Sequence, residues 1–314
     1  MNQRSSRPVS LPTIRSPQFI AAVIVAVLAF VPLGARGAVG MAWLPGTVVV
    51  FAIAALAVVL TRNAPNAWRA PALRDWYDAR PRTAATILAF LAFATYVVVA
   101  WTVFDASPLN IDELAQVVQA RIFRGGDLWL PASRHPEFFA AYHMVDVGGK
   151  VYSQFPAGGP LLLAVGELVG TPWIVMPLCG AIAVAAFGWY LRAAEPRPSV
   201  ALGALLLFAL SPFVAFMSGT YMNHVSTLAC LLVGVAALAL LTRTRTSLGS
   251  HAGLAFVCGL GFGCAATIRP TDALAFALPA GVWMLARAVR YARWSDVVFA
   301  GAGVAIPLAL LMWV

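Results

Sequence analysis

The chain has 314 residues, of which 61% are hydrophobic and only 11% charged, and its formal net charge is +9. A soluble domain carries about 25% charged residues, so a soluble enzyme is excluded, and the long apolar runs exclude a β-barrel, whose strands alternate. The positive charge is almost all arginine, which in a membrane protein reports sidedness and gives no support to nucleic-acid binding. We therefore expect an all-α, polytopic bundle of about nine or ten membrane segments in a lipid bilayer.

The N-terminal part predicts a tail and two helices. Residues 1–16 are polar and rich in proline, which is typical of a cytoplasmic tail. Two apolar runs follow, at 17–35 and 41–61, each close to the ~20 residues that cross a hydrocarbon core. The linker that ends at residue 83 is rich in arginine, so the positive-inside rule predicts that it is cytoplasmic. We take 17–83 as an addition that precedes a transmembrane core at 84–314.

A third apolar run, 84–104, delivers the polar stretch 105–155 to the outer face, and half of the twelve acidic residues lie in that stretch. Apolar residues recur there with helical spacing from Ile111 to Ile122. Asn110 is a good N-cap, and Glu113 falls at the third position of a capping box. Asp112 then lies in the first turn, where the helix dipole favours a carboxylate, and we expect it to face water or a cavity. An acidic residue in a first turn is equally typical of a simple helix start.

The second half of this loop predicts a β-hairpin and a sharp turn into the membrane. Residues 144–153 alternate around Gly148-Gly149, the pair that favours a two-residue hairpin turn. Lys150 and Tyr152 lie on its second strand. Proline and glycine are dense at 156–160, which favours the abrupt start of a helix.

Seven further apolar runs follow, at 156–170, 173–191, 201–217, 225–242, 252–268, 271–287 and 297–314. The first has about fifteen residues, roughly 22 Å as a helix, which is short for a full crossing. If it does not cross, most basic residues fall on the cytoplasmic side, as the positive-inside rule requires. Asp112, His224 and Arg269 then share the outer face. The chain ends inside an apolar run, so we expect it to be the N-terminal part of a longer protein.

Arg269 and His224 are the candidate binding residues of the later outer turns. Arg269 precedes Pro270, which predicts that a helix ends there. An arginine between two apolar runs either binds an anion or reaches the lipid headgroups, and both readings stay open. His224 is a candidate ligand-binding residue or an ordinary boundary histidine. No histidine or cysteine pair has metal-ligand spacing, so we predict no metal site.

The ordered set of motifs resembles the polytopic GT-C glycosyltransferases. It begins with an outer loop that carries Asp112-Glu113 at the start of a surface helix. It continues through residues 121–127 (RIFRGGD), 152–161 (YSQFPAGGPL), 211–224 and 261–270. The resemblance covers 84–314 and is closest to the protein-mannosyltransferase, aminoarabinose-transferase and lipid-A galacturonosyltransferase-like groups.

The resemblance implies transfer of a sugar from a polyprenyl-phosphate-linked donor to an envelope glycan, lipid or protein on the extracytoplasmic face of the cell membrane. Asp112, with Glu113, is then the catalytic carboxylate, and the substrate-binding residues are Arg269, His224, Tyr152 and Lys150. Many relatives carry a second acidic residue where this chain has His224, which favours chemistry without a metal, and no cofactor is implied beyond the donor. The alternatives are a transporter or flippase of lipid-linked substrates, and a non-catalytic membrane scaffold.

Overall fold

The computed structural model describes residues 71–135, 138, 141–243 and 248–313. The chain divides into two units, Met1–Pro71 and Ala72–Val314, and almost everything described belongs to the second. The predicted tail at 1–16 and the predicted helices at 17–35 and 41–61 lie outside the described residues.

The second unit is built from helices, with a small sheet between two of them. The strands are β1 (Leu130–Pro131), β2 (Met144–Val147) and β3 (Lys150–Ser153). The helices are α3 (Pro71–Ala79), α4 (Pro81–Thr102), α5 (Ile111–Arg124), α7 (Gly158–Leu168), η2 (Pro172–Ile174), α8 (Val175–Ala194), α9 (Pro198–Ala209), α10 (Pro212–Gly219), α11 (His224–Arg243), α12 (Leu248–Ile268), α13 (Pro270–Tyr291) and α14 (Trp294–Trp313).

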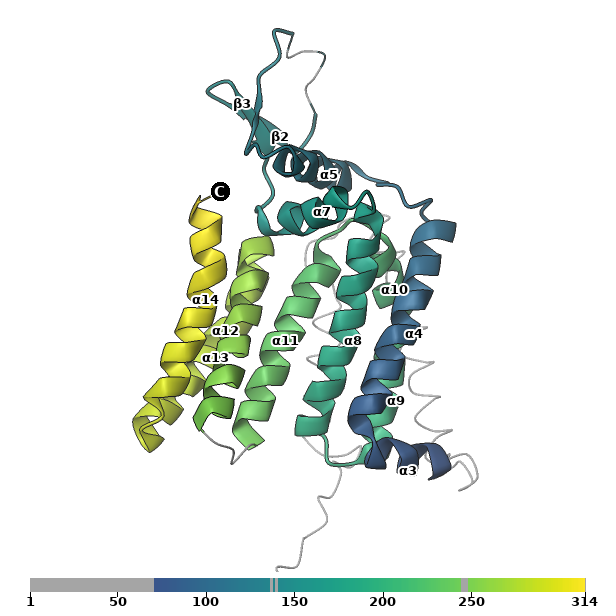
Figure 1. Cartoon of the computed structure of the whole chain (residues 1–314), viewed down its shortest axis with the longest axis vertical. Helices are drawn as coiled ribbons and strands as arrows, with labels where there is room; N and C mark the ends of the chain where they lie inside the picture. The colour runs from purple at the N-terminus through teal and green to yellow at the C-terminus, as the bar shows by residue number, and fades with distance from the viewer. Residues whose placement is uncertain (1–70, 136–137, 139–140, 244–247, 314) are drawn as a thin grey trace, which may run out of the picture. The chain divides into compact units, whose positions relative to one another are not determined.

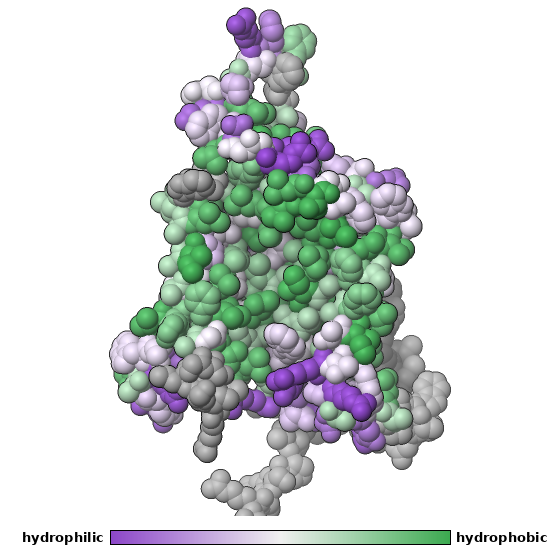
Figure 2. Space-filling model, viewed as in Figure 1, coloured by the Kyte–Doolittle hydropathy of each residue, from purple (hydrophilic) through white to green (hydrophobic). Residues whose placement is uncertain are grey.

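Six of the described helices are long and apolar enough to cross a membrane: α4, α8 with η2, α11, α12, α13 and α14. Figure 1 shows these helices side by side, with α5 and α7 lying across their ends. Figure 2 shows an apolar middle zone between two polar ends. Large apolar side chains such as Phe90 and Leu207 are more than 70% exposed, as expected for a surface that faces lipid. The prediction of an all-α bundle is confirmed for the described residues. They contain six candidate spans, or seven if the bent pair at 198–219 counts as one span, compared with the nine or ten segments predicted for the whole chain.

The short apolar run at 156–170 does not form a full span. It contains α7, whose 11 residues extend for only about 16 Å, whereas the hydrocarbon core is about 30 Å thick. Because α7 lies across the helix ends (Figure 1), the chain leaves α4 and enters α8 at the same end of the bundle. The end that carries α5 and the sheet is called the loop end below.

The opposite end of the bundle carries arginine and aromatic side chains. Arg82 and Arg192 lie with Trp189 around one hollow. Arg287 and Arg290 lie with Trp283 and Tyr291 around another. Arginines with interfacial tryptophan and tyrosine are typical of a membrane boundary, and their position opposite the loop end agrees with the predicted alternation of the spans.

One predicted run differs from a simple span. The apolar stretch at 201–217 forms two helices, α9 and α10, which are bent by 42° relative to each other. Ser211-Pro212 lies at the break between them. Proline has no N–H to donate to the preceding turn and is well suited to a first helical position, so α10 starts anew at Pro212.

The predicted hairpin is present in the loop. Val147 pairs with Lys150 across Gly148 and Gly149, which have φ of +61° and +79°. Both glycines occupy the left-handed region that a type I′ turn requires. The third strand, β1, was not predicted; it pairs with β3 through Leu130 and Val151.

Candidate functional site

A pocket of about 380 Å³ lies at the loop end of the bundle. It is formed where the first turns of α5, the segment before α7, the start of α11 and the junction of α12 with α13 meet. Its lining residues are Asp112, Gln116, Phe155, Pro156, Met222, Asn223, His224, Ile268, Arg269, Pro270 and Thr271. Three of the residues predicted from the sequence, Asp112, His224 and Arg269, therefore line one pocket.

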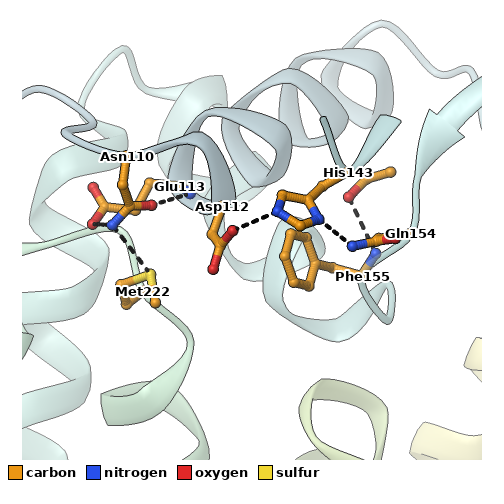
Figure 3. A network of polar contacts seen from close by, with 8 residues as sticks. Asn110, Asp112, Glu113, His143, Gln154, Phe155 and Met222 are labelled. Atoms are coloured by element: carbon orange, nitrogen blue, oxygen red, sulfur yellow. Dashed lines mark hydrogen bonds and ion pairs between the residues drawn. The ribbon is translucent and has the colours of Figure 1, made fainter. Parts of the chain in front are cut away.

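The start of α5 presents Asp112 to this pocket. The Asn110 side chain accepts a hydrogen bond of 2.9 Å from the Glu113 backbone N–H, which confirms the predicted N-cap. The Asp112 side chain is 42% exposed, and its Oδ1 lies 2.8 Å from Nε2 of His143. Figure 3 shows His143 between Asp112 and Gln154.

Glu113 points away from the pocket although it follows Asp112 directly. It is 1% exposed, and its carboxylate accepts hydrogen bonds of 3.0 Å from the Leu109 backbone N–H and from Asn110 Nδ2. Burial raises the pKa of the Glu113 carboxyl, against the lowering effect of the backbone groups of Leu109 and Tyr221. Successive helical residues point about 100° apart, so only one of the two predicted carboxylates lines the pocket.

Arg269 lies at the junction between two membrane helices, as Pro270 predicted. α12 ends at Ile268, and Arg269 is the N-cap of α13. Its Nε lies 2.7 Å from Asp272 Oδ2 in the first turn of α13. This ion pair occupies one edge of the guanidinium, while the residue itself lines the pocket. The anion that Arg269 binds in the structure is Asp272 of its own helix, so binding of a ligand anion stays a prediction.

Three of the lining side chains have a buried polar atom without a hydrogen-bond partner in the part of the chain that the structure describes. These atoms are Gln116 Oε1, Asn223 Oδ1 and His224 Nδ1. Leaving a buried polar group unpaired costs about 1–3 kcal/mol, so such groups normally find a partner. The atoms themselves are buried, but all three residues line the pocket, so a polar ligand there would lie close to unsatisfied groups. Sequence reasoning missed Gln116 and Asn223, although one lies a helical turn from Asp112 and the other next to His224.

Lys150 and Tyr152 are not among the residues that line the pocket. Lys150 Nζ lies 3.9 Å from the centre of the ring of Trp129, the residue directly before β1, in a cation–π contact. Tyr152 pairs with Val145 on β2. Both predicted substrate-binding residues therefore lie on β3 of the hairpin, outside the lining of this pocket.

A second, apolar pocket of about 270 Å³ lies beside the first and shares Ile268 with it. Its walls come from α7, α11, α12 and α14: Gly158, Leu161, Leu162, Val165, Cys230, Cys264, Thr267, Pro307, Leu310 and Leu311. The two pockets together have one polar and one apolar side, which matches a ligand with a polar head and a hydrocarbon chain.

A glycine pair lets α7 approach the ends of α11 and α12. A Cβ on Gly158 would lie 2.7 Å from the backbone carbonyl of Thr267, and a Cβ on Gly159 would overlap the Asn223 side chain. Only glycine therefore allows α7 to pack this closely on the ends of α11 and α12, where the polar and the apolar pocket adjoin.

The described residues contain no group of three or more His, Cys, Asp or Glu side chains arranged to hold a metal ion. Comparison of the chain with protein-family models, with curated proteins and with solved structures gives no match, so the chemistry of the pocket itself is the basis for a function.

Proposed function

We propose that this protein is a membrane glycosyltransferase of the GT-C type, which moves a sugar from a polyprenyl-phosphate-linked donor to a hydroxyl of a cell-envelope acceptor. The observation that carries the proposal is the pair of adjoining pockets. One contains the carboxylate of Asp112 and the guanidinium of Arg269, and the other is apolar and lies among the membrane helices.

The phosphate of the donor is assigned to Arg269. The Nε of its guanidinium is bound to Asp272, which leaves the two terminal nitrogens as a fork for phosphate oxygens. Two long helices, α11 and α13, also begin at residues that line the pocket, His224 and Pro270. Helix N-termini carry partial positive charge, so they add to the attraction for an anion.

The sugar is assigned to the polar side of the pocket, which is lined by Gln116, Asn223 and His224. The oxygens of Gln116 and Asn223 are acceptors, and sugar hydroxyls are donors of matching polarity. The first prenyl units extend from the phosphate into the apolar pocket, where leucines of α7 and α14 replace water around them.

In this proposal Asp112 is the general base. The acceptor hydroxyl oxygen attacks the anomeric carbon, and the bond from that carbon to the phosphate oxygen breaks. The leaving phosphate takes the bonding electron pair beside Arg269, and the hydroxyl proton passes to Asp112. A positioned base contributes about 10²–10⁴ in rate to such a step.

We infer the orientation of the protein in the membrane from the basic end of the bundle. Arginine enrichment marks the cytoplasmic side, so the pocket is assigned to the extracytoplasmic face of the cell membrane. In the described spans the charged residues lie close to helix ends. That arrangement gives little support to the alternative of an ion-coupled transporter, which needs charges within the membrane.

Binding of a synthetic polyprenyl phosphate to the purified full chain in nanodiscs tests the proposal. We expect Arg269→Lys to weaken binding about tenfold, because lysine keeps the charge but loses the fork. Arg290→Lys, at the opposite end, is the matched control and leaves binding unchanged. Equal binding by the wild type and Arg269→Lys contradicts the assignment of the phosphate. A panel of polyprenyl-phosphate sugars with envelope extract then tests transfer, and release of polyprenyl phosphate is the readout.

A further inference from the structure

His143 forms an arrangement with Asp112 that the proposed chemistry has not used. Its Nε2 lies 2.8 Å from Asp112 Oδ1, and its Nδ1 contacts the side-chain amide nitrogen of Gln154. An ionised carboxylate can only accept, so the ring nitrogen that faces Asp112, Nε2, carries a proton. The imidazole therefore donates to Asp112, while the Gln154 side chain contacts the other ring nitrogen (Figure 3).

The backbone and the ring of His143 are both held in place. Its φ is +65°, in the left-handed region that few residues other than glycine adopt. Its carbonyl accepts a hydrogen bond of 2.9 Å from the Gln154 backbone N–H. Its ring packs against Phe155 at 5.3 Å between ring centres, and Phe155 lines the pocket. An unusual backbone conformation held by several contacts is typical of a residue with a functional task.

The same contacts exclude His143 as the base itself. Both ring nitrogens are occupied, one by Asp112 and the other by Gln154, so neither is free to accept a proton from a substrate. His143 is also not among the residues that line the pocket, whereas Asp112 is. Asp112 uses one carboxylate oxygen for His143, which leaves the other for the acceptor hydroxyl.

We propose that His143 is a positioning residue, which holds Asp112 in the orientation that faces the acceptor, and that Gln154 supports the His143 ring in this position. This assignment rests on the proposed function, in which Asp112 is the base. A carboxylate that is free to rotate is in the productive geometry for only part of the time, and a displacement of about 1 Å can cost about 10²-fold in rate.

Turnover of three variants tests the role in transfer. His143→Phe keeps an aromatic ring beside Phe155 but cannot donate, and we expect kcat to fall about 10- to 100-fold with KM unchanged. His143→Gln places an amide nitrogen near the position of Nε2, and we expect it to retain kcat within about threefold. In an Asp112→Asn background, His143→Phe should cause a further loss below about twofold, because it acts through Asp112. A full, additive loss in that background, or a failure of His143→Gln as severe as that of His143→Phe, overturns the inference.

A measurement without substrate separates the pair from the proposed function. Diethyl pyrocarbonate modifies free imidazole nitrogens, and its rate at His143 is measured by mass spectrometry of the labelled full chain. We expect the rate to rise several-fold in Asp112→Ala and in Gln154→Ala, and to stay unchanged in the control Asp127→Ala on the same loop. Equal rates in all four proteins refute the pair. Raised rates together with an absence of transfer by the wild type refute the proposed function, and with it the role of the pair in transfer.

Discussion

Two neighbouring carboxylates, Asp112 and Glu113, offer a matched test of the site. Only Asp112 lines the pocket, while Glu113 is buried in the cap of α5. We expect Asp112→Asn to lower kcat by about 10²–10⁴, equivalent to about 2.7–5.4 kcal/mol of transition-state stabilisation. Its side chain is 42% exposed, so the loss of its interaction with the helix dipole costs only about 0.3–1 kcal/mol of stability.

Glu113→Gln should have the opposite profile. Its remaining carbonyl oxygen can still accept from the Leu109 N–H, so we expect turnover to stay near that of the wild type. Burial raises the pKa of Glu113 above the ordinary 4.5. At a pH between 4.5 and the raised pKa, the folded state therefore keeps a proton on Glu113 that the unfolded state has lost. The stability of the wild type relative to Glu113→Gln should therefore fall as the pH rises from 4.5 towards the raised pKa, and stay low above it.

The assay combines thermal unfolding of the purified proteins at several pH values with transfer from a polyprenyl-phosphate sugar at a single pH. Near-normal turnover by a stable Asp112→Asn protein would falsify the assignment of the base. A loss of turnover in Glu113→Gln as large as that in Asp112→Asn, with unfolding unchanged, would show that the pocket has been assigned to the wrong carboxylate.

Two further predictions concern the fold. Gly158→Ala should destabilise the chain by about 1–3 kcal/mol in thermal unfolding, because the added Cβ overlaps the Thr267 backbone. In the control Gly203→Ala the added Cβ meets no atom within 4 Å, so this variant should be neutral or slightly stabilising. Equal effects of the two substitutions contradict the close approach of α7. In a background without native cysteines, Lys150→Cys and Arg290→Cys should react with an impermeant thiol reagent from opposite sides of the membrane, and labelling from the same side contradicts the arrangement of the spans.

The sequence by itself determined the features that depend on short-range chemistry. Hydrophobic run length predicted the spans, because the thickness of the bilayer acts on each helix separately. Asn110 and the Gly148-Gly149 pair predicted the N-cap and the hairpin, because both are decided by backbone groups within four residues. The end of α12 before Pro270 was predicted for the same reason.

Local patterns were less informative where a helix packs on several neighbours. α9 and α10 read as a single apolar run, and hydropathy does not register a bend at Pro212. The capping-box pattern separated Glu113 from Asp112, and the structure has Glu113 turned inwards to Leu109 and Asn110. The pattern did not say which distant helices would form a pocket around Asp112.

Only the tertiary structure decided which residues share the site. Asp112, Asn223 and Arg269 are more than 40 residues apart in sequence, and they meet because α7 lies across the helix ends instead of crossing. His143 and Gln154 lie opposite each other at the open end of the β2–β3 hairpin, one pair beyond Met144 and Ser153. Nothing in the sequence relates this pair to Asp112, which the fold of the loop brings to His143. Contacts between distant segments depend on how the helices pack as a set, so the pocket, its unpaired polar atoms and the orientation of Asp112 are properties of the folded chain.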